Sequence, residues 1–201
     1  LNDIHYIDTL LSLCYYCTTG QLSSAFEREL EKYLSLPITF DQTLPLFEHN
    51  PKNSEVDSLL KEATDGIRIF HTPDKKHKIY CFEDRLGSSG RFYSVYLQYV
   101  KNGKVTWNQI ADWRAGKYSN QRIDKIYTFL HNGQTYYVLI SYCYNVAYFE
   151  IVTIENGNFI THSEFYPKQF QNNIKDGVIE FYGGSDSYFD LEFDSQTLTI
   201  N

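Results

Sequence analysis

The spacing of apolar residues changes character once along the chain, near residue 66. Before that point, apolar residues from Ile4 to Cys14 recur at helical intervals, which predicts a helix over residues 3–17. From residue 67 onward the period becomes two, and Gly-containing turn signals recur. We therefore predict a helical N-terminal segment (1–66) and an antiparallel β body (67–201) that together form one folded unit.

Two further helices are expected in the N-terminal segment. Ser24 and Glu27 form a capping-box pattern, in which each side chain can bond the other residue's backbone amide. The helix that follows has one apolar face, made of Phe26, Leu30, Tyr33 and Leu34. Pro37 should end it, because proline disfavours helical geometry in the residue before it. An ordered loop is expected from residue 38 to residue 53, and a third helix over 54–66.

The β body is predicted from alternating segments separated by turns. Strands are expected near 67–71, 78–83, 92–100, 104–107, 123–131, 134–143, 147–154, 158–165, 178–182, 188–194 and 197–200. Asn-Gly pairs at 102–103, 132–133 and 156–157 favour type I′ turns, because Asn and Gly tolerate positive φ. The segment from Thr135 to Cys143 is apolar on both faces, so it should be central. The fold class is α+β and mostly β, with the helices packed on a bent meander that closes as a barrel, a sandwich or a propeller-like sheet.

Composition and charge exclude some function classes. Aromatic residues make up 17% of the 201 residues and the net charge is -7. The chain has no run rich in Lys or Arg, so it should be repelled by phosphate backbones and anionic lipid. We therefore predict no nucleic-acid partner. No apolar run approaches the length of about 20 residues that a membrane span needs.

The four cysteines bear on location. Their even number fits an oxidising compartment, and the chain starts at Leu1 without any Met, so we expect an exported protein whose leader is removed. The disulfide candidates are Cys14, Cys17, Cys81 and Cys143. Cys14 and Cys17 lie toward the end of a predicted helix, where thiol activation is not expected. A zinc site from all four lacks a second closely spaced pair, which leaves packed thiols or disulfides as alternatives.

No catalytic or cofactor-binding motif is recognisable. The six histidines show no metal-ligand spacing, and residues 87–90 do not meet the spacing of a nucleophile elbow. Paired carboxylates such as Glu83 and Asp112 could serve glycoside hydrolysis, but most acidic surfaces offer such pairs. We therefore predict no metal and no cofactor, and the chain is interpreted as a non-enzyme.

One stretch without clean periodicity, residues 107–122, is the candidate binding loop. Its candidate ligand-binding residues are Trp107, Asp112, Trp113, Arg114 and Tyr118. Long loops in compact domains are often functional, and exposed Trp rings stack on sugars or grip protein partners. The alternative is that both Trp side chains cover the open end of the sheet.

A short part of the chain carries a family resemblance. Residues 72–84, the glycines at 87 and 90, Phe92 and the pair Gln98-Tyr99 form a turn, a strand, a Gly-rich loop and a second strand. This pattern resembles that of uncharacterised exported proteins of gut-type Gram-negative bacteria, with Lys75, Cys81 and Phe82 in place of the usual Gly, Ser and Trp. The resemblance implies an exported β-rich protein and carries over no catalytic residue.

Three function hypotheses follow. The first is an exported, non-enzymatic domain that binds a ligand or a protein through loops at one end of the β body. The second is a carbohydrate-binding module or glycan hydrolase that uses Trp107 and Trp113 as platforms, so the expected partner is a protein or a glycan. The third is an intracellular inhibitor or immunity-type protein with an acidic face and reduced thiols.

Overall fold

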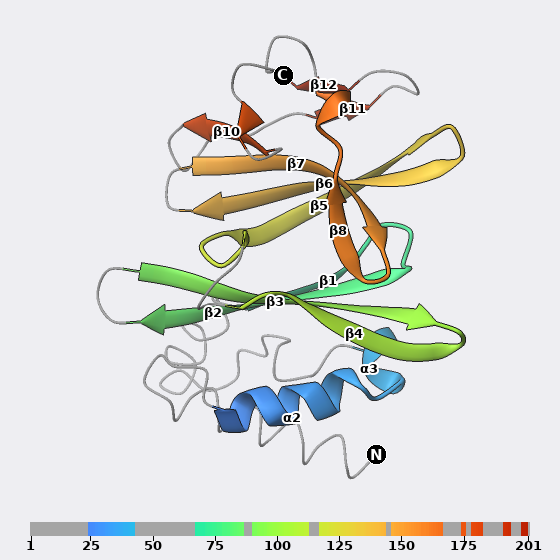
Figure 1. Cartoon of the computed structure of the whole chain (residues 1–201), viewed down its shortest axis with the longest axis vertical. Coiled ribbons are helices and arrows are strands. Elements are labelled where there is room, and N and C mark those ends of the chain that lie inside the picture. Colours follow the sequence, from blue (N-terminus) through green and yellow to red (C-terminus); the bar gives the residue numbers. More distant parts are fainter. Residues whose placement is uncertain are drawn as a thin grey trace, which may run out of the picture. The chain divides into compact units, whose positions relative to one another are not determined.

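The computed structural model describes residues 24–42, 67–86, 90–112, 117–143, 146–166, 174–175, 178–182, 191–193 and 198–200. The chain divides into two compact units (Figure 1). Unit 1 holds both described helices and β1 to β4, and unit 2 holds Thr72–Asp74 and the described elements from Gln121 onward. The described helices and the first four strands thus belong to one compact unit. The predicted helices over 3–17 and 54–66 lie outside the described residues.

Unit 1 contains a four-stranded antiparallel sheet in the order β1-β2-β3-β4. Its strands are β1 (Ile67–His71), β2 (His77–Leu86), β3 (Gly90–Lys101) and β4 (Lys104–Ala111). All four were expected, but the prediction that β4 ends at residue 107 was wrong. Val95 and Tyr96 of β3 pair with Ala111 and Gln109, so Ile110 is an extra, bulged residue of β4 and the pairing continues to Ala111. Trp107 lies inside this strand and not in a loop.

Two helices precede this sheet. Helix α2 (Ser24–Leu34) begins and ends close to the predicted positions and lies against one face of the sheet (Figure 1). Leu30, Tyr33 and Leu34 are buried, as the helical spacing indicated. The short helix α3 (Ile38–Asp41) was predicted as loop. It forms because Pro37 has φ -55, which suits a helix start, and because the buried Thr39 hydroxyl bonds the Leu36 carbonyl oxygen at 2.7 Å.

A buried polar network holds the helices to the sheet. Gln98 Nε2 donates to the Leu34 carbonyl oxygen and to Thr39 Oγ1, both at 2.8 Å. The Tyr80 hydroxyl lies 3.0 Å from both Gln98 Oε1 and the Thr39 carbonyl oxygen. Lys78 Nζ donates to the carbonyl oxygens of Thr39 and Gln42, each at 2.7 Å. Buried polar groups are tolerated when they are bonded to one another, so this network fixes where the helical segment docks.

Lys78 should make the stability of the protein depend on pH. Burial lowers the pKa of Lys78 from 10.5 to about 8, and the Asp41 carboxylate only partly opposes this. Above the folded pKa and below the unfolded one, the unfolded chain binds more protons, so a rise in pH favours folding. Between about pH 7 and about pH 9 we expect the free energy of unfolding to rise by about 1 kcal/mol through this group.

Urea denaturation of the wild type and of Lys78→Met at both pH values measures this contribution. The variant has no ammonium group at this position, so the wild type should gain about 1 kcal/mol of unfolding free energy relative to the variant as the pH rises. Equal changes of the unfolding free energy with pH in the two proteins would contradict the prediction.

Unit 2 is built on a second antiparallel sheet, in the order β5-β6-β7-β10-β9, with β8 paired to β7. Its strands are β5 (Arg122–His131), β6 (Gln134–Cys143), β7 (Val146–Glu155), β8 (Asn158–Thr161), β9 (Ile174–Lys175) and β10 (Val178–Tyr182). Strands β11 (Leu191–Phe193) and β12 (Leu198–Ile200) pair with each other. The predicted central position of β6 is confirmed, since it lies between β5 and β7. The mostly β, antiparallel class is confirmed as well.

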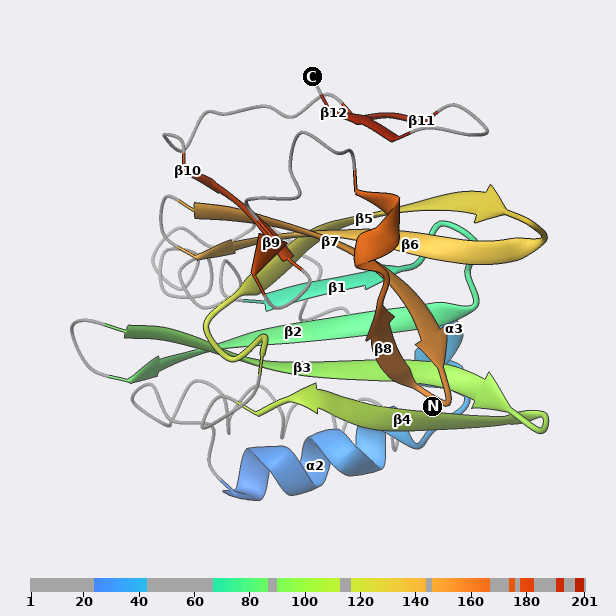
Figure 2. The same cartoon turned by 45° about the horizontal axis from the view of Figure 1, so that its top comes forward.

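The hairpin turns follow the prediction. Asn102, Asn132 and Asn156 have φ near +50, and the glycine after each also has positive φ. These values match type I′ turns, whose twist suits antiparallel strands. The strand predicted over 158–165 is shorter than expected, because β8 ends at Thr161 and the 3₁₀ helix η1 (Ser163–Phe165) follows. Figure 2 shows β8 running steeply across the direction of β5 and β6.

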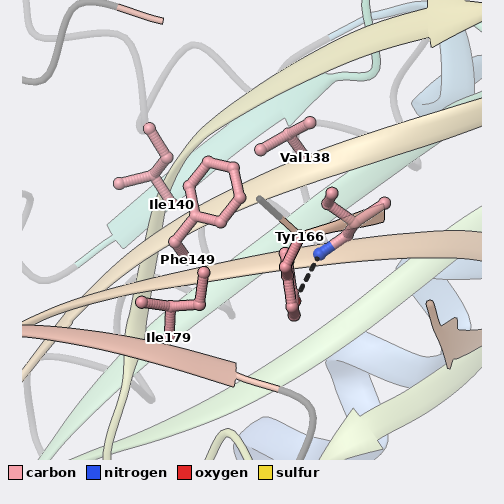
Figure 3. Close-up of a cluster of buried hydrophobic side chains, with 6 residues drawn as sticks. Val138, Ile140, Phe149, Tyr166 and Ile179 are labelled. Atoms are coloured by element: carbon pink, nitrogen blue, oxygen red, sulfur yellow. Dashed lines mark hydrogen bonds between the residues drawn. The ribbon is translucent and has the colours of Figure 1, made fainter. Parts of the chain in front are cut away.

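One face of the unit 2 sheet carries a compact hydrophobic core (Figure 3). Its buried members are Val138, Ile140, Phe149, Ile151, Tyr166 and Ile179. Tyr166 follows η1 and brings its ring 6.0 Å from that of Phe149, measured between centroids. Its hydroxyl oxygen accepts a hydrogen bond from the Ile151 amide at 3.0 Å. The segment after β8 is therefore anchored to the sheet by a side chain that reaches into the core.

Candidate functional site

Five aromatic and histidine rings gather beside this core, where the β5–β6 hairpin turns. We call them the aromatic patch: Phe129, His131, Tyr136, His162 and Phe165. All five side chains are half-buried. Together they form a partly exposed surface next to the buried core of unit 2.

Local structure explains how these rings meet. Phe129 and His131 are two residues apart on β5, so they share one face of the strand. The Asn132-Gly133 turn places Tyr136 of β6 directly opposite Phe129, and their rings are stacked with centroids 5.2 Å apart. Phe165 of η1 completes the cluster, with its ring centroid 4.7 Å from that of Tyr136 and 5.1 Å from that of His131.

A chain of hydrogen bonds lies at the border of the patch. His162 Nδ1 lies 2.9 Å from Glu164 Oε1, and His162 Nε2 lies 2.9 Å from Thr153 Oγ1. The Thr153 hydroxyl donates to Glu155 Oε1 at 3.3 Å. These hydrogen bonds connect β7 with the segment around η1 and hold the His162 ring in place. The centroid of that ring is 5.1 Å from that of Tyr136.

The order carboxylate, histidine, hydroxyl invites comparison with a nucleophilic triad. In such a triad the histidine takes the proton of an accessible hydroxyl. Here Thr153 is only 2% exposed, so its hydroxyl is out of reach of a substrate. The Thr153 hydroxyl is therefore not placed as a nucleophile, and its hydrogen bonds with His162 and Glu155 hold these side chains in position.

Glu164 contributes a negative charge at the border of the aromatic patch. Burial alone would raise the pKa of its carboxyl group, but the bonds from its own backbone amide and from His162 hold that pKa below the usual value. Its side chain is 63% exposed. Glu164 is therefore ionised near neutral pH and faces solvent.

An exposed aliphatic side chain extends the patch. Ile160 of β8 is 42% exposed and pairs with Thr153 of β7. Residues directly opposite in an antiparallel pair share a face, and His162 is two residues further along, so Ile160 lies on the same side as His162. Large exposed aliphatic side chains next to aromatic rings are typical of docking surfaces.

The predicted binding loop is only partly described. Trp107 lies half-buried in β4, where its ring packs edge to face on Tyr96 and its Nε1 donates to Ser35 Oγ at 3.1 Å. Asp112 is half-buried, and Tyr118 is buried with Lys117 Nζ 5.7 Å from its ring centroid. Trp113 and Arg114 lie outside the described residues. Trp107 contributes to helix packing, since its neighbour Ser35 directly follows α2.

The other predicted candidates are placed as follows. Cys81 is a buried thiol in β2, and Cys143 is a half-buried thiol at the end of β6, with a pKa that burial raises. Cys14 and Cys17 fall outside the described residues, so the disulfide expectation stays a prediction. In the described ranges, groups of three or more His, Cys, Asp or Glu side chains that could hold a metal ion are not found.

Comparisons with known proteins identify no relative of this chain. No protein-family model, curated protein or solved structure matches the chain. The resemblance of residues 72–99 to exported proteins stays an expectation. Within the part of the chain that the structure describes, no helix has the length and apolar character needed to cross a membrane.

The aromatic patch was missed in the sequence because its members come from three separate elements. His131 and His162 showed no metal-ligand spacing, and Phe165 was expected in a strand. A usable signal did exist: Phe129 and Tyr136 are symmetric about the Asn132-Gly133 turn, so the turn type alone predicts that they face each other.

Proposed function

We propose that this chain is a non-enzymatic binding domain that docks a protein partner on the aromatic patch of unit 2. The supporting observation is a cluster of five half-buried rings bordered by the exposed Ile160. Aromatic side chains dominate the energetic centres of protein interfaces, because each buries a large area at low cost in conformational entropy. The hydrogen bonds of His162 hold part of this surface in place before binding, which lowers the ordering cost.

The packing of the rings on one another favours a protein partner over a glycan. Sugar binding needs a flat ring face open to solvent, whereas several rings here pack edge to face on one another, Phe165 against Phe129, His131 and Tyr136. The sugar platform expected at Trp107 also loses support, since that indole packs on Tyr96 and bonds Ser35. A glycan-binding or glycan-cleaving role is therefore the second choice.

Export, and the closure of the sheets as a barrel, a sandwich or a propeller-like body, belong to this proposal as well. The even number of cysteines supports export, because disulfides persist in oxidising compartments. A count of thiols in the denatured, unreduced protein tests this part directly. Four thiols per chain would remove the support for export.

Capture from the native host with three immobilised proteins tests the binding role: the wild type, Ile160→Gln and Val100→Gln. Ile160 borders the patch, whereas Val100 is an exposed residue of β3 in unit 1, 51% exposed against 42% for Ile160. We expect one protein to be retained by the wild type and by Val100→Gln, and to bind Ile160→Gln at least about tenfold more weakly. Removal of one well-packed apolar contact in an interface costs this much.

The same partner, once purified, should show this difference in a binding isotherm. If Ile160→Gln and the wild type bind it equally, or if Val100→Gln is the weaker variant, the patch is not the binding surface.

A further inference from the structure

Two exposed carboxylates flank the aromatic patch. Glu155 at the end of β7 accepts from Thr153, and Glu164 of η1 accepts from His162. Thr153 and His162 are bonded to each other, so the carboxylates stand at the two ends of one hydrogen-bonded chain. Each uses its Oε1 oxygen in this chain, and both residues are exposed. The two negative charges are thus held in fixed positions beside the rings.

The nearby described charges do not cancel this pair. On β5, Arg122 pairs with Asp124 at 3.4 Å, and Lys125 lies six residues along the strand from His131, roughly 20 Å at the usual rise per residue. The titratable groups that face the patch are His131 on β5, His162 after β8 and Tyr136 on β6. Glu155 and Glu164 are the exposed acidic side chains at the border of the patch.

We propose, resting on the function above, that the aromatic patch recognises a basic segment of its protein partner. An Arg side chain would place its guanidinium group over the rings and donate to Glu155 or Glu164, while an apolar neighbour covers Ile160. Guanidinium groups stack on aromatic faces and form paired bonds with carboxylates, which makes arginine the cation that suits this surface. The net charge of -7 would also speed the approach of a basic partner.

Capped peptides test this inference without knowledge of the partner. The probe is acetyl-Gly-Arg-Leu-Arg-Gly-amide, and its control carries citrulline, the neutral isostere, in place of each Arg. Titration at about pH 7.5, followed through the His and aromatic ring resonances, should give at least about tenfold tighter binding for the arginine peptide. Added salt should weaken that binding, because charges at the surface are screened.

Variants assign the effect to the two carboxylates. In the double variant Glu155→Gln/Glu164→Gln, the arginine peptide should bind no more than about twofold more tightly than the citrulline peptide. The control, Glu31→Gln with Asp41→Asn, removes the same number of charges from exposed positions of unit 1 and should keep the preference.

Equal binding of the two peptides, or an unchanged preference in the Glu155/Glu164 variant, would overturn the basic-segment inference. Absence of binding by either peptide at millimolar concentration would overturn it too. These results do not affect the comparison of partner binding between the wild type and Ile160→Gln. A failure of this inference can therefore be told apart from a failure of the proposed binding role.

Discussion

Replacement of Gln98 by Ala should lower the free energy of unfolding by about 3 to 5 kcal/mol. The Gln98 side chain is buried and links three groups: its Nε2 bonds the Leu34 carbonyl oxygen and Thr39 Oγ1, and its Oε1 faces the Tyr80 hydroxyl. Truncation leaves these polar groups without a buried partner and opens a cavity between helix and sheet. Each such loss costs about 1 to 3 kcal/mol.

Gln109→Ala is the matched control for Gln98. Gln109 is exposed on β4 of the same sheet, and its Nε2 donates to the Tyr96 hydroxyl at 3.3 Å. Loss of this part-buried bond, whose donor side chain is exposed, should cost about 1 kcal/mol or less. Urea denaturation followed by circular dichroism measures both variants. Similar unfolding free energies for the two would show that the buried network does not hold the helical segment to the sheet.

Tyr166→Ala is expected to have an effect of the same size, about 3 to 5 kcal/mol. The side chain is 3% exposed, packs on Phe149 and accepts from the Ile151 amide. Tyr166→Phe keeps the ring but leaves that amide without its acceptor, so it should cost about 1 to 3 kcal/mol. The order of stability is therefore wild type, Tyr166→Phe, Tyr166→Ala.

The Tyr166 variants also connect the core to the aromatic patch. Tyr166 directly follows η1, which carries Phe165, so loss of its anchor should loosen the rings around Tyr136. Amide hydrogen exchange should rise at residues 162–166 in Tyr166→Phe, with β2 and β3 of unit 1 unchanged. Exchange that rises equally in both units would mean that Tyr166 supports overall stability and not the local position of η1.

The strands and turns were predictable because their causes are local. Asn-Gly pairs set the hairpins at Asn102, Asn132 and Asn156, and alternation of side chains set the faces between them. The end of β4 was not predictable, since its pairing as far as Ala111 includes a bulge at Ile110 that is defined only by the register with β3. The same holds for α3, whose Thr39 is bonded by Gln98 from a distant part of the chain.

The candidate site was harder to predict than the fold for a similar reason. Trp107 attracted attention by residue type, yet its place opposite Gln98 in β4 directs it to the helix-covered face. The aromatic patch depends on the way β8 and η1 return His162 and Phe165 to the β5–β6 hairpin. Contacts between residues so far apart in sequence leave no periodic signal along the chain.

Site-specific photo-cross-linking in the native host tests the central claim most directly. A photoreactive phenylalanine analogue would replace Ile160 in one protein and Leu130 in another. Leu130 is 64% exposed, and alternation along β5 places it on the face opposite to Phe129 and His131. The account predicts a covalent adduct with one partner protein from position 160 and none from position 130. The same adducts from both positions, or an adduct from position 130 alone, would contradict it.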